Sequence, residues 1–154
     1  MFEECKLEGD FTLSSGRTSK VFYDFDLLKP IEAAIYVEQL VQQIPKEVKN
    51  QIGFIAAPAM GGIIPGFLVA FAQKKPLVVI DKEGKTRGPD FRGGKYLVVD
   101  DVITTFQAAR LVKDALPECE CLGVAAYIFR GSYRDLEANK DIPAFYLARK
   151  EQEE

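Results

Sequence analysis

The chain has 154 residues, of which 47% are hydrophobic and 28% are charged. This length and composition predict one folded domain spanning residues 1–154 and exclude a disordered chain. The formal net charge of −3 excludes a global positive field, so we expect no nucleic-acid partner. The sequence contains no histidine, which excludes catalytic triads built on histidine and removes the commonest zinc ligand.

Cysteine usage and hydropathy indicate where the protein works. Cys5, Cys119 and Cys121 are odd in number and lack C-x-x-C spacing, as is typical of reduced thiols in a cytosol. The longest apolar run, residues 61–72, is too short to span a bilayer, and the acidic amino terminus lacks the apolar core of a signal peptide. We therefore expect a cytoplasmic protein with no membrane partner.

The first third of the chain predicts a small β-rich segment followed by a helix. Phe11, Leu13 and then residues 21–25 alternate around a Ser/Gly/Thr/Ser cluster, which is typical of two strands joined by a turn. Pro30 then begins a helical pattern that ends before Pro45. Its predicted apolar stripe comprises Ile31, Ala34, Ile35 and Val41.

The rest of the chain alternates short apolar strands with helices. The predicted strands cover residues 52–57, 77–80, 96–99, 121–129 and 145–148, and the predicted helices cover 63–73 and 104–116. The second helix should turn Ala108, Val112, Ala115 and Leu116 inward. Because parallel strands need right-handed crossovers, this order predicts an α/β fold: an open, mostly parallel twisted sheet flanked by helices on both faces.

A polar insertion, DKEGKTRGPDFRGGK (residues 81–95), separates two of these strands. It is rich in glycine and basic residues and has no apolar periodicity. Such a long insertion in a compact domain is typical of a functional or mobile loop. Its simpler interpretation is a solvated basic turn.

Ligands of open α/β sheets bind beyond the carboxyl ends of the strands, so the loops after three strands should converge there. Asp100 and Asp101 come just past an apolar strand, and Thr104 and Thr105 follow at the start of the predicted helix. By itself this pattern also fits a polar strand end with a helix cap. Likewise, the Gly61-Gly62 pair also fits a helix-entry turn, and Arg130 a surface cation.

Five segments, taken in order, resemble the type I phosphoribosyltransferases, and most closely their orotate members. The strand and loop YLVVDDVITTFQAA is similar to the family's thirteen-residue signature. The other four are FTLSSGRTSKVFYDFD (residues 11–26), IAAPAMGGIIPG (55–66), DKEGKTRG (81–88) and AAYIFRG (125–131). They resemble, respectively, the amino-terminal signature, the pyrophosphate loop, the mobile catalytic loop and the strand that carries an orotate-binding arginine.

The resemblance implies that a small amino-terminal hood covers the sheet, and that the protein catalyses a phosphoribosyl transfer. Phosphoribosyl would pass from phosphoribosyl pyrophosphate to orotate, giving orotidine monophosphate and pyrophosphate. The residues implied to bind phosphoribosyl pyrophosphate are Ala59, Met60, Gly61, Gly62, Asp100, Asp101, Thr104, Thr105, Phe106, Gln107 and Ala108. Arg130 and Thr104 would bind orotate, and Lys82, Lys85 and Arg87 would be catalytic.

The resemblance also implies a cofactor and an assembly. Mg²⁺ would be held through the substrate, with Asp100 and Asp101 in its outer shell. A homodimer is expected, in which the loop reaches across the interface, and the apolar segment from Ile63 to Phe71 is richer than one buried helix face needs. The expected partners are thus small-molecule substrates and a second copy of the chain.

Several positions depart from the family pattern. Phe106 stands where the signature has glycine, Gln107 and Ala108 replace small polar residues, and Phe129 replaces an aspartate. The basic loop is also short. Either the Phe106 ring turns into the core and leaves the phosphate site intact, or it distorts the site; from the sequence we expect a distorted site with weaker donor binding. A non-catalytic relative that senses a nucleotide or phosphoribosyl ligand, or transfer to another base, remain as alternatives.

Overall fold

The computed structural model describes residues 1–13 and 15–150. Ser14, within the segment that resembles the amino-terminal signature, and residues 151–154 of the predicted domain lie outside this description.

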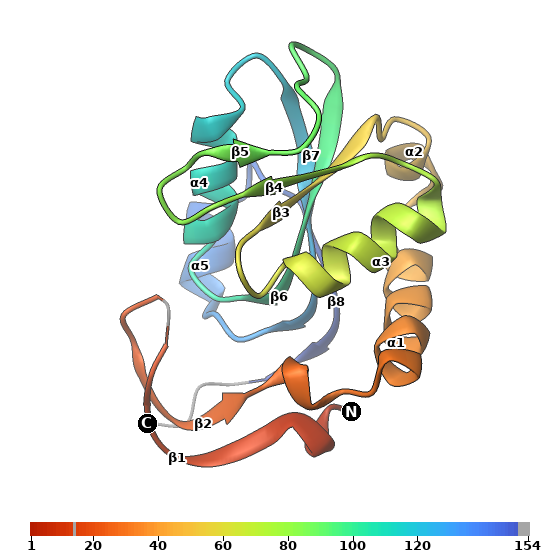
Figure 1. Ribbon diagram of the computed structural model, residues 1–154. Coiled ribbons are helices and arrows are strands. Elements are labelled where there is room, and N and C mark those ends of the chain that lie inside the picture. Colours follow the sequence, from red (N-terminus) through yellow and green to blue (C-terminus); the bar gives the residue numbers. More distant parts are fainter. Residues whose placement is uncertain (14, 151–154) are drawn as a thin grey trace.

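A six-stranded sheet with the order β5-β4-β3-β6-β7-β8 forms the centre of the molecule (Figure 1). Its strands are β3 (Phe54–Pro58), β4 (Leu77–Ile80), β5 (Thr86–Arg87), β6 (Lys95–Ile103), β7 (Glu120–Phe129) and β8 (Ala144–Arg149). Neighbouring strands are parallel except β4 and β5. The predicted open, mostly parallel α/β sheet is confirmed.

Helices cover both faces of the sheet and create two hydrophobic cores. The helices are α1 (Pro30–Gln43), α2 (Lys46–Lys49), α3 (Ile63–Gln73), α4 (Gln107–Ala115) and α5 (Tyr133–Ala138). In Figure 1, α1 and α3 lie on one side of the sheet, and α4 and α5 lie on the other. None of the described helices is long and apolar enough to cross a membrane.

The amino-terminal segment is an antiparallel hairpin of β1 (Lys6–Thr12) and β2 (Thr18–Tyr23), flanked by the short 3-10 helices η1 (Glu3–Cys5) and η2 (Phe25–Leu27). This hairpin, called the hood below, lies beneath the end of the sheet at which β6 finishes (Figure 1). The predicted pair of strands joined by a turn is confirmed. Phe2, Cys5 and Phe25 at its base are buried in the same core as α1.

The predicted apolar stripe of α1 is wrong for Ile31 and Ile35, although Val41 does pack against the core. The helix buries Ala33, Val37 and Leu40, whereas Ile31 and Ile35 are 67% and 49% exposed. Both sets have helical spacing, so the sequence pattern alone does not decide which set faces the sheet. The exposed set belongs to an apolar surface that is described below.

The strand that carries the two aspartates is longer than predicted, and the following helix is shorter. β6 runs to Ile103 because its pairing with β7 continues from Asp100 opposite Ala126 to Ile103 opposite Phe129. Asp100 and Asp101 therefore lie within the strand, and α4 begins at Gln107. The prediction that Thr104 and Thr105 begin the helix is wrong, because both lie in the connecting loop. Within α4, the fully buried residues are Ala109 and Val112 rather than Ala108 and Ala115.

The polar insertion contains a short strand and a hydrogen-bonded turn that its composition does not predict. Its first half folds back as β5, which pairs antiparallel with β4. Asp81 organises the turn, because its Oδ1 accepts hydrogen bonds from the N–H groups of Glu83 (3.0 Å) and Lys85 (2.9 Å). The second half is anchored by Phe91, whose ring stacks on Phe54 at 4.2 Å.

Candidate functional site

The predicted site residues fall on three neighbouring loops and on the hood. The turn after β3, the end of β6 with its following loop, and the end of β7 lie at the carboxyl edge of the parallel strands. The hood covers this edge (Figure 1). This is the place at which an open α/β sheet binds its ligands.

Asp100 and Asp101 form a half-buried acidic pair at the end of β6. The Asp101 N–H donates to Asp100 Oδ1 at 2.8 Å, and the Val102 N–H donates to Asp101 Oδ1 at 2.8 Å. Burial raises the pKa of both carboxyl groups, and the neighbouring Asp101 charge raises that of Asp100 further. No ion pair reaches either carboxylate from the described residues. The pair is thus an acceptor site that hydroxyl donors or a cation would stabilise.

The turn after β3 packs directly against this pair. A Cβ on Gly61 would lie 2.6 Å from both carboxylate oxygens of Asp101, and a Cβ on Gly62 would lie 2.6 Å from the Val99 carbonyl oxygen. Both glycines are therefore required by close approach. In the described residues, the N–H groups of Met60 and Gly61 make no hydrogen bond, so they remain available to an anion.

The loop between β6 and α4 supplies a second set of backbone donors. Within the described residues, the N–H groups of Thr105, Phe106, Gln107 and Ala108 donate no hydrogen bond, as is expected at a helix amino terminus. Phe106 adopts a left-handed conformation with φ 68°. Its ring is buried, with its centroid 6.3 Å from that of Phe129. The ring therefore turns into the core, away from the row of amides.

Asn139, at the end of α5, supports this loop and was not predicted. Its Nδ2 donates to the Thr105 carbonyl oxygen at 3.4 Å, while its Oδ1 accepts from Arg110 Nε at 3.1 Å. Gly131 lies against the Thr104 carbonyl oxygen so closely that a Cβ would overlap it. The sequence gives no local signal for these contacts, because they join residues that lie far apart along the chain.

Arg130 is buried rather than a surface cation. Its side chain is 2% exposed, its Nη1 donates to the Val21 carbonyl oxygen at 2.9 Å, and its Nη2 donates to Ser19 Oγ at 3.1 Å. The guanidinium also lies over the Tyr23 ring at 5.1 Å. All three partners belong to β2, so Arg130 ties the hood to the end of β7.

A second arginine fixes the tip of the hood. Arg17 Nη1 and Nη2 each lie 2.8 Å from a different carboxylate oxygen of Asp135 in α5. Asp135 also accepts from the Ser132 N–H at 2.7 Å. Ser132-x-x-Asp135 is a capping-box pattern that can be recognised from sequence, but its pairing with Arg17 cannot.

The three basic residues of the insertion that were predicted to be catalytic make no ion pair with Asp100 or Asp101 within the described residues. Lys82, Lys85 and Arg87 are exposed, and Arg87 Nε lies 3.8 Å from Asp81 Oδ2. The hairpin tip lies beside α4, since a Cβ on Gly84 would be 3.6 Å from Leu111 Cδ1. The site of one subunit is therefore formed without these cations.

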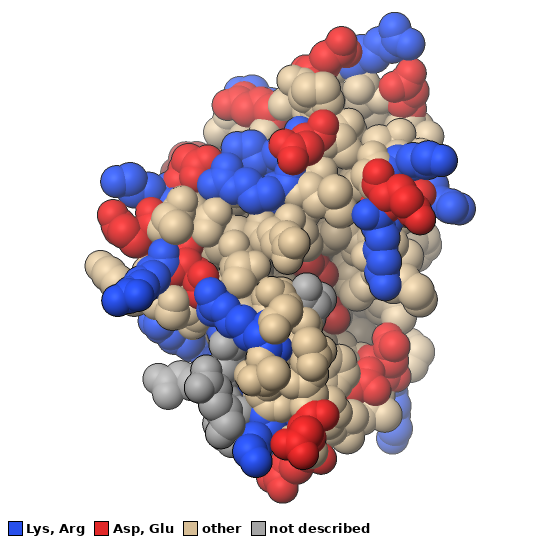
Figure 2. Space-filling model, turned by 90° about the vertical axis from the view of Figure 1, so that its left-hand side faces the viewer, with Lys and Arg blue, Asp and Glu red and all other residues tan. Residues whose placement is uncertain are grey.

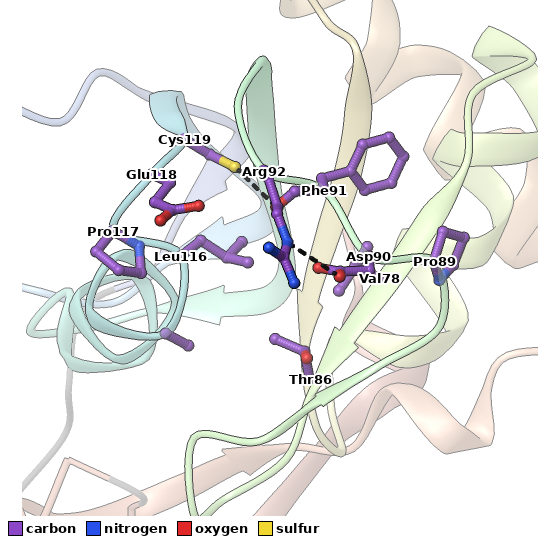
Figure 3. A pocket seen from close by; sticks show the side chains of 11 residues that line it. Val78, Thr86, Pro89, Asp90, Phe91, Arg92, Leu116, Pro117, Glu118 and Cys119 are labelled. Atoms are coloured by element: carbon purple, nitrogen blue, oxygen red, sulfur yellow. Dashed lines mark hydrogen bonds and ion pairs between the residues drawn. The ribbon is translucent and has the colours of Figure 1, made fainter.

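A separate pocket of about 180 Å³ lies at the opposite end of the strands (Figure 3). Pro117, Glu118 and Cys119, which line it, directly precede β7, whereas the aspartates lie at the carboxyl end of β6. Arg92 and Asp90 line it as an exposed ion pair of 3.5 Å. None of the predicted site residues lines this pocket. It is therefore separate from the candidate site at the carboxyl edge of the sheet.

The surface carries no concentrated charge over the face in Figure 2, where basic and acidic side chains are interspersed. An anionic ligand must therefore be recognised by local groups such as the free amides, rather than by the field of the whole face.

The comparisons with solved structures identify the class. No protein-family model matches the chain. The structure is similar to the crystal structure of orotate phosphoribosyltransferase from Aeropyrum pernix, with a TM-score of 0.80 and 24% identity, covering 94% of this chain and 88% of that one. The parallel sheet, the hood and the carboxyl-edge loops are those of a type I phosphoribosyltransferase fold.

The curated relatives identify the family. The chain is 35% identical over 127 residues to the orotate phosphoribosyltransferase of Parvibaculum lavamentivorans, covering 78% of this chain and 66% of the relative. It is 30% identical over 143 residues to that of Sphingopyxis alaskensis, covering 85% of this chain and 71% of the relative. The chain belongs to the orotate phosphoribosyltransferase family. It spans about two thirds of the length of these relatives.

Proposed function

We propose that the protein transfers phosphoribosyl from phosphoribosyl pyrophosphate to orotate, forming orotidine monophosphate and pyrophosphate. The observation that carries this proposal is the contact between the Gly61 turn and the Asp101 carboxylate. It brings a set of free amides beside an acidic pair, which are the two groups that a sugar with an attached pyrophosphate needs. The relatives named orotate phosphoribosyltransferase favour transfer over the non-catalytic alternative.

Asp100 and Asp101 would hold the two ribose hydroxyls. Hydroxyl donors return to these buried carboxylates part of the hydrogen bonding that burial removes, so binding of the diol would lower their raised pKa values. Holding the sugar at both hydroxyls fixes C1′ relative to the incoming base. Positioning of this kind supplies much of the rate when orotate itself is the nucleophile.

Two rows of amides would hold the anionic ends of the donor. The N–H groups from Thr105 to Ala108 would bind the 5′-phosphate at the amino terminus of α4. Those of Met60 and Gly61 would approach the pyrophosphate, where negative charge grows as the bond to C1′ breaks. The buried Phe106 ring leaves the first row open.

The residues present fit a Mg²⁺ ion held mainly by substrate. No group of three or more potential ligand side chains occurs within the described residues, but Mg²⁺ commonly binds through one or two carboxylates together with substrate phosphates. Asp100 and Asp101 would provide its outer shell. When bound, the ion would neutralise charge on the leaving pyrophosphate.

Arg130 and Thr104 would bind orotate beneath the hood. A planar guanidinium matches a planar carboxylate, and the hood holds the Arg130 side chain in one orientation through Val21 and Ser19. The hood would also screen the reacting atoms from water. Lys82, Lys85 and Arg87 would reach the pyrophosphate of a neighbouring subunit in a homodimer.

The test is a spectrophotometric assay of orotate consumption with Mg²⁺ and phosphoribosyl pyrophosphate. We expect turnover with orotate and little with uracil, which lacks the carboxylate. Arg130→Ala should weaken orotate binding by about 1.5–3 kcal/mol and leave donor binding nearly unchanged. Arg149→Ala is the matched control, because Arg149 lies over Phe129 at 5.6 Å and makes no hydrogen bond or ion pair with the described part of the hood. Equal use of uracil and orotate would contradict the assignment.

A further inference from the structure

Tyr127 lies beside Asp101 on the same face of the sheet. The register pairs Asp100 with Ala126 and Val102 with Ile128, so residues 101 and 127 are level on adjacent parallel strands. Tyr127 belongs to the core on the side covered by α1, together with Val99 and Ala125. The Asp101 carboxylate lies against Gly61, in the turn that leads into α3 on the same side of the sheet. Tyr127 is thus the lateral neighbour of the aspartate to which we assign the sugar.

The Tyr127 side chain is completely buried, yet its hydroxyl has no hydrogen-bond partner among the described residues. Its ring packs among the rings of Phe2 (5.6 Å), Phe25 (4.9 Å) and Tyr36 (6.3 Å). A phenylalanine would preserve this packing without burying an unsatisfied hydroxyl, which is destabilising. The hydroxyl therefore has no evident structural purpose in the ligand-free protein.

Asp101 has acceptor capacity to spare. Its carboxylate accepts a hydrogen bond from the Val102 N–H and shares one with the Asp100 side chain, whereas an ionised carboxylate offers about four acceptor positions. Burial first, and then the nearby Asp101 charge, raise the pKa of Tyr127. The phenol therefore keeps its proton and can serve as a donor.

We propose that Tyr127 is a positioning residue, whose hydroxyl donates toward Asp101, directly or through one ordered water, when the phosphoribosyl group is bound. The hydrogen bond would hold the carboxylate against the Gly61 turn in the orientation that receives a ribose hydroxyl. This inference rests on the function proposed above. Tyr127 would thus strengthen donor binding through Asp101, without contacting the donor itself.

The test compares Tyr127→Phe with Tyr36→Phe. Tyr36 is the matched control because it belongs to the same aromatic cluster, but its hydroxyl already donates to Glu4 Oε1 at 2.8 Å. The probes are ribose 5-phosphate, which carries the diol and needs no metal, and phosphoribosyl pyrophosphate with Mg²⁺. Affinities are measured by calorimetry and melting temperatures by thermal unfolding.

We expect Tyr127→Phe to bind both probes about three- to tenfold more weakly, the range for one net hydrogen bond, with a melting temperature equal to or above that of the parent. Tyr36→Phe should bind both probes like the parent and should not be stabilised. In an Asp101→Ala background, Tyr127→Phe should have little further effect, because residue 101 then offers the hydroxyl no acceptor.

Unchanged affinity in Tyr127→Phe overturns the inference, whatever its stability. Equal weakening in both backgrounds also overturns it, because the hydroxyl would then act without Asp101. A parent protein that binds neither probe instead contradicts the proposed function. The two failures are therefore distinguishable.

Discussion

Phe106 adopts a left-handed backbone conformation that is usually reserved for glycine. Its φ of 68° lies in the left-handed region, which a bulky side chain occupies at a free-energy cost of roughly 1–3 kcal/mol. Burial of the ring beside Phe129 offsets that cost. The backbone of the loop therefore retains the course that glycine would give it, and the distorted phosphate site expected from the sequence is not required.

We expect both Phe106→Gly and Phe106→Ala to lower the free energy of unfolding, because each removes a buried ring worth about 3–5 kcal/mol. The glycine variant should be the more stable of the two by about 1 kcal/mol, since alanine retains the left-handed strain. Denaturant unfolding measures both values. Donor affinity, measured by calorimetry, should change less than threefold in the glycine variant; a large gain in affinity would restore the distorted-site interpretation.

At the scale of elements, the hood is held by two arginines in addition to the apolar side chains that it buries, such as Val21 and Tyr23. Burial alone would raise the pKa of Asp135, but the hydrogen bonds from Arg17 and Ser132 outweigh it and lower the pKa. A carboxyl group with a lowered folded-state pKa contributes stability above its unfolded pKa of about 3.9, and this contribution is lost as pH falls through the folded-state value.

Asp135→Asn should therefore lower the free energy of unfolding by about 1–3 kcal/mol at pH 7 and increase hydrogen exchange in β2. The difference from the parent should shrink as pH falls below about 4. Asp141→Asn is the control, since it breaks an ion pair with Arg110 outside the hood and should leave exchange in β2 unchanged. A constant difference between parent and Asp135→Asn from pH 7 to pH 3 would show that charge at Asp135 is not the cause.

The β4–β5 hairpin carries the exposed cations that we assign to the pyrophosphate. Lys85→Ala should lower kcat about ten- to hundredfold and change donor affinity less than threefold, because its charge would act mainly as pyrophosphate leaves. Lys140→Ala, which removes an exposed lysine paired with Glu137, should leave both unchanged. Steady-state kinetics separates the two parameters, and unchanged kcat in Lys85→Ala would remove the hairpin from the mechanism.

Local patterns predicted most of the elements, and tertiary pairing decided the rest. The bounds of α3 and β4 were predicted correctly, because their apolar runs are flanked by Gly62 and Lys74 and by Pro76 and Asp81. The extent of β6 was not, because Asp100 and Asp101 are held in a strand only by the neighbouring β7. Asn139 and the Arg17–Asp135 pair gave no usable signal, since their contacts join residues far apart along the chain.

At the scale of the whole molecule, the two helices that cover one face of the sheet, α1 and α3, expose an apolar surface. The outward side chains of α1 and α3 are large and hydrophobic, and the residues preceding these helices extend the surface. It comprises Leu27, Ile31, Ile35, Met60, Ile64, Phe67 and Phe71. Clustered exposed side chains of this size are typical of an interface rather than of a free surface. An interface at this surface would explain both observations: the exposure of Ile31 and Ile35 on α1, and the excess of apolar residues in α3.

We expect a homodimer that buries this apolar surface, because the face that it occupies is the only described one on which two helices both present large apolar residues outward. Phe67→Asp with Phe71→Asp should convert the dimer to a monomer in sedimentation, since two charges would be buried without partners. Tyr133→Asp is the control: Tyr133 is 73% exposed on α5, across the sheet, and its loss should leave the dimer intact.

If the monomeric variant still folds, its donor affinity should persist while its turnover falls, because the amides and aspartates lie within one subunit, whereas Lys82 and Lys85 would serve the other. A parent protein that sediments only as a monomer at high concentration would contradict this assembly and leave the basic hairpin without a target.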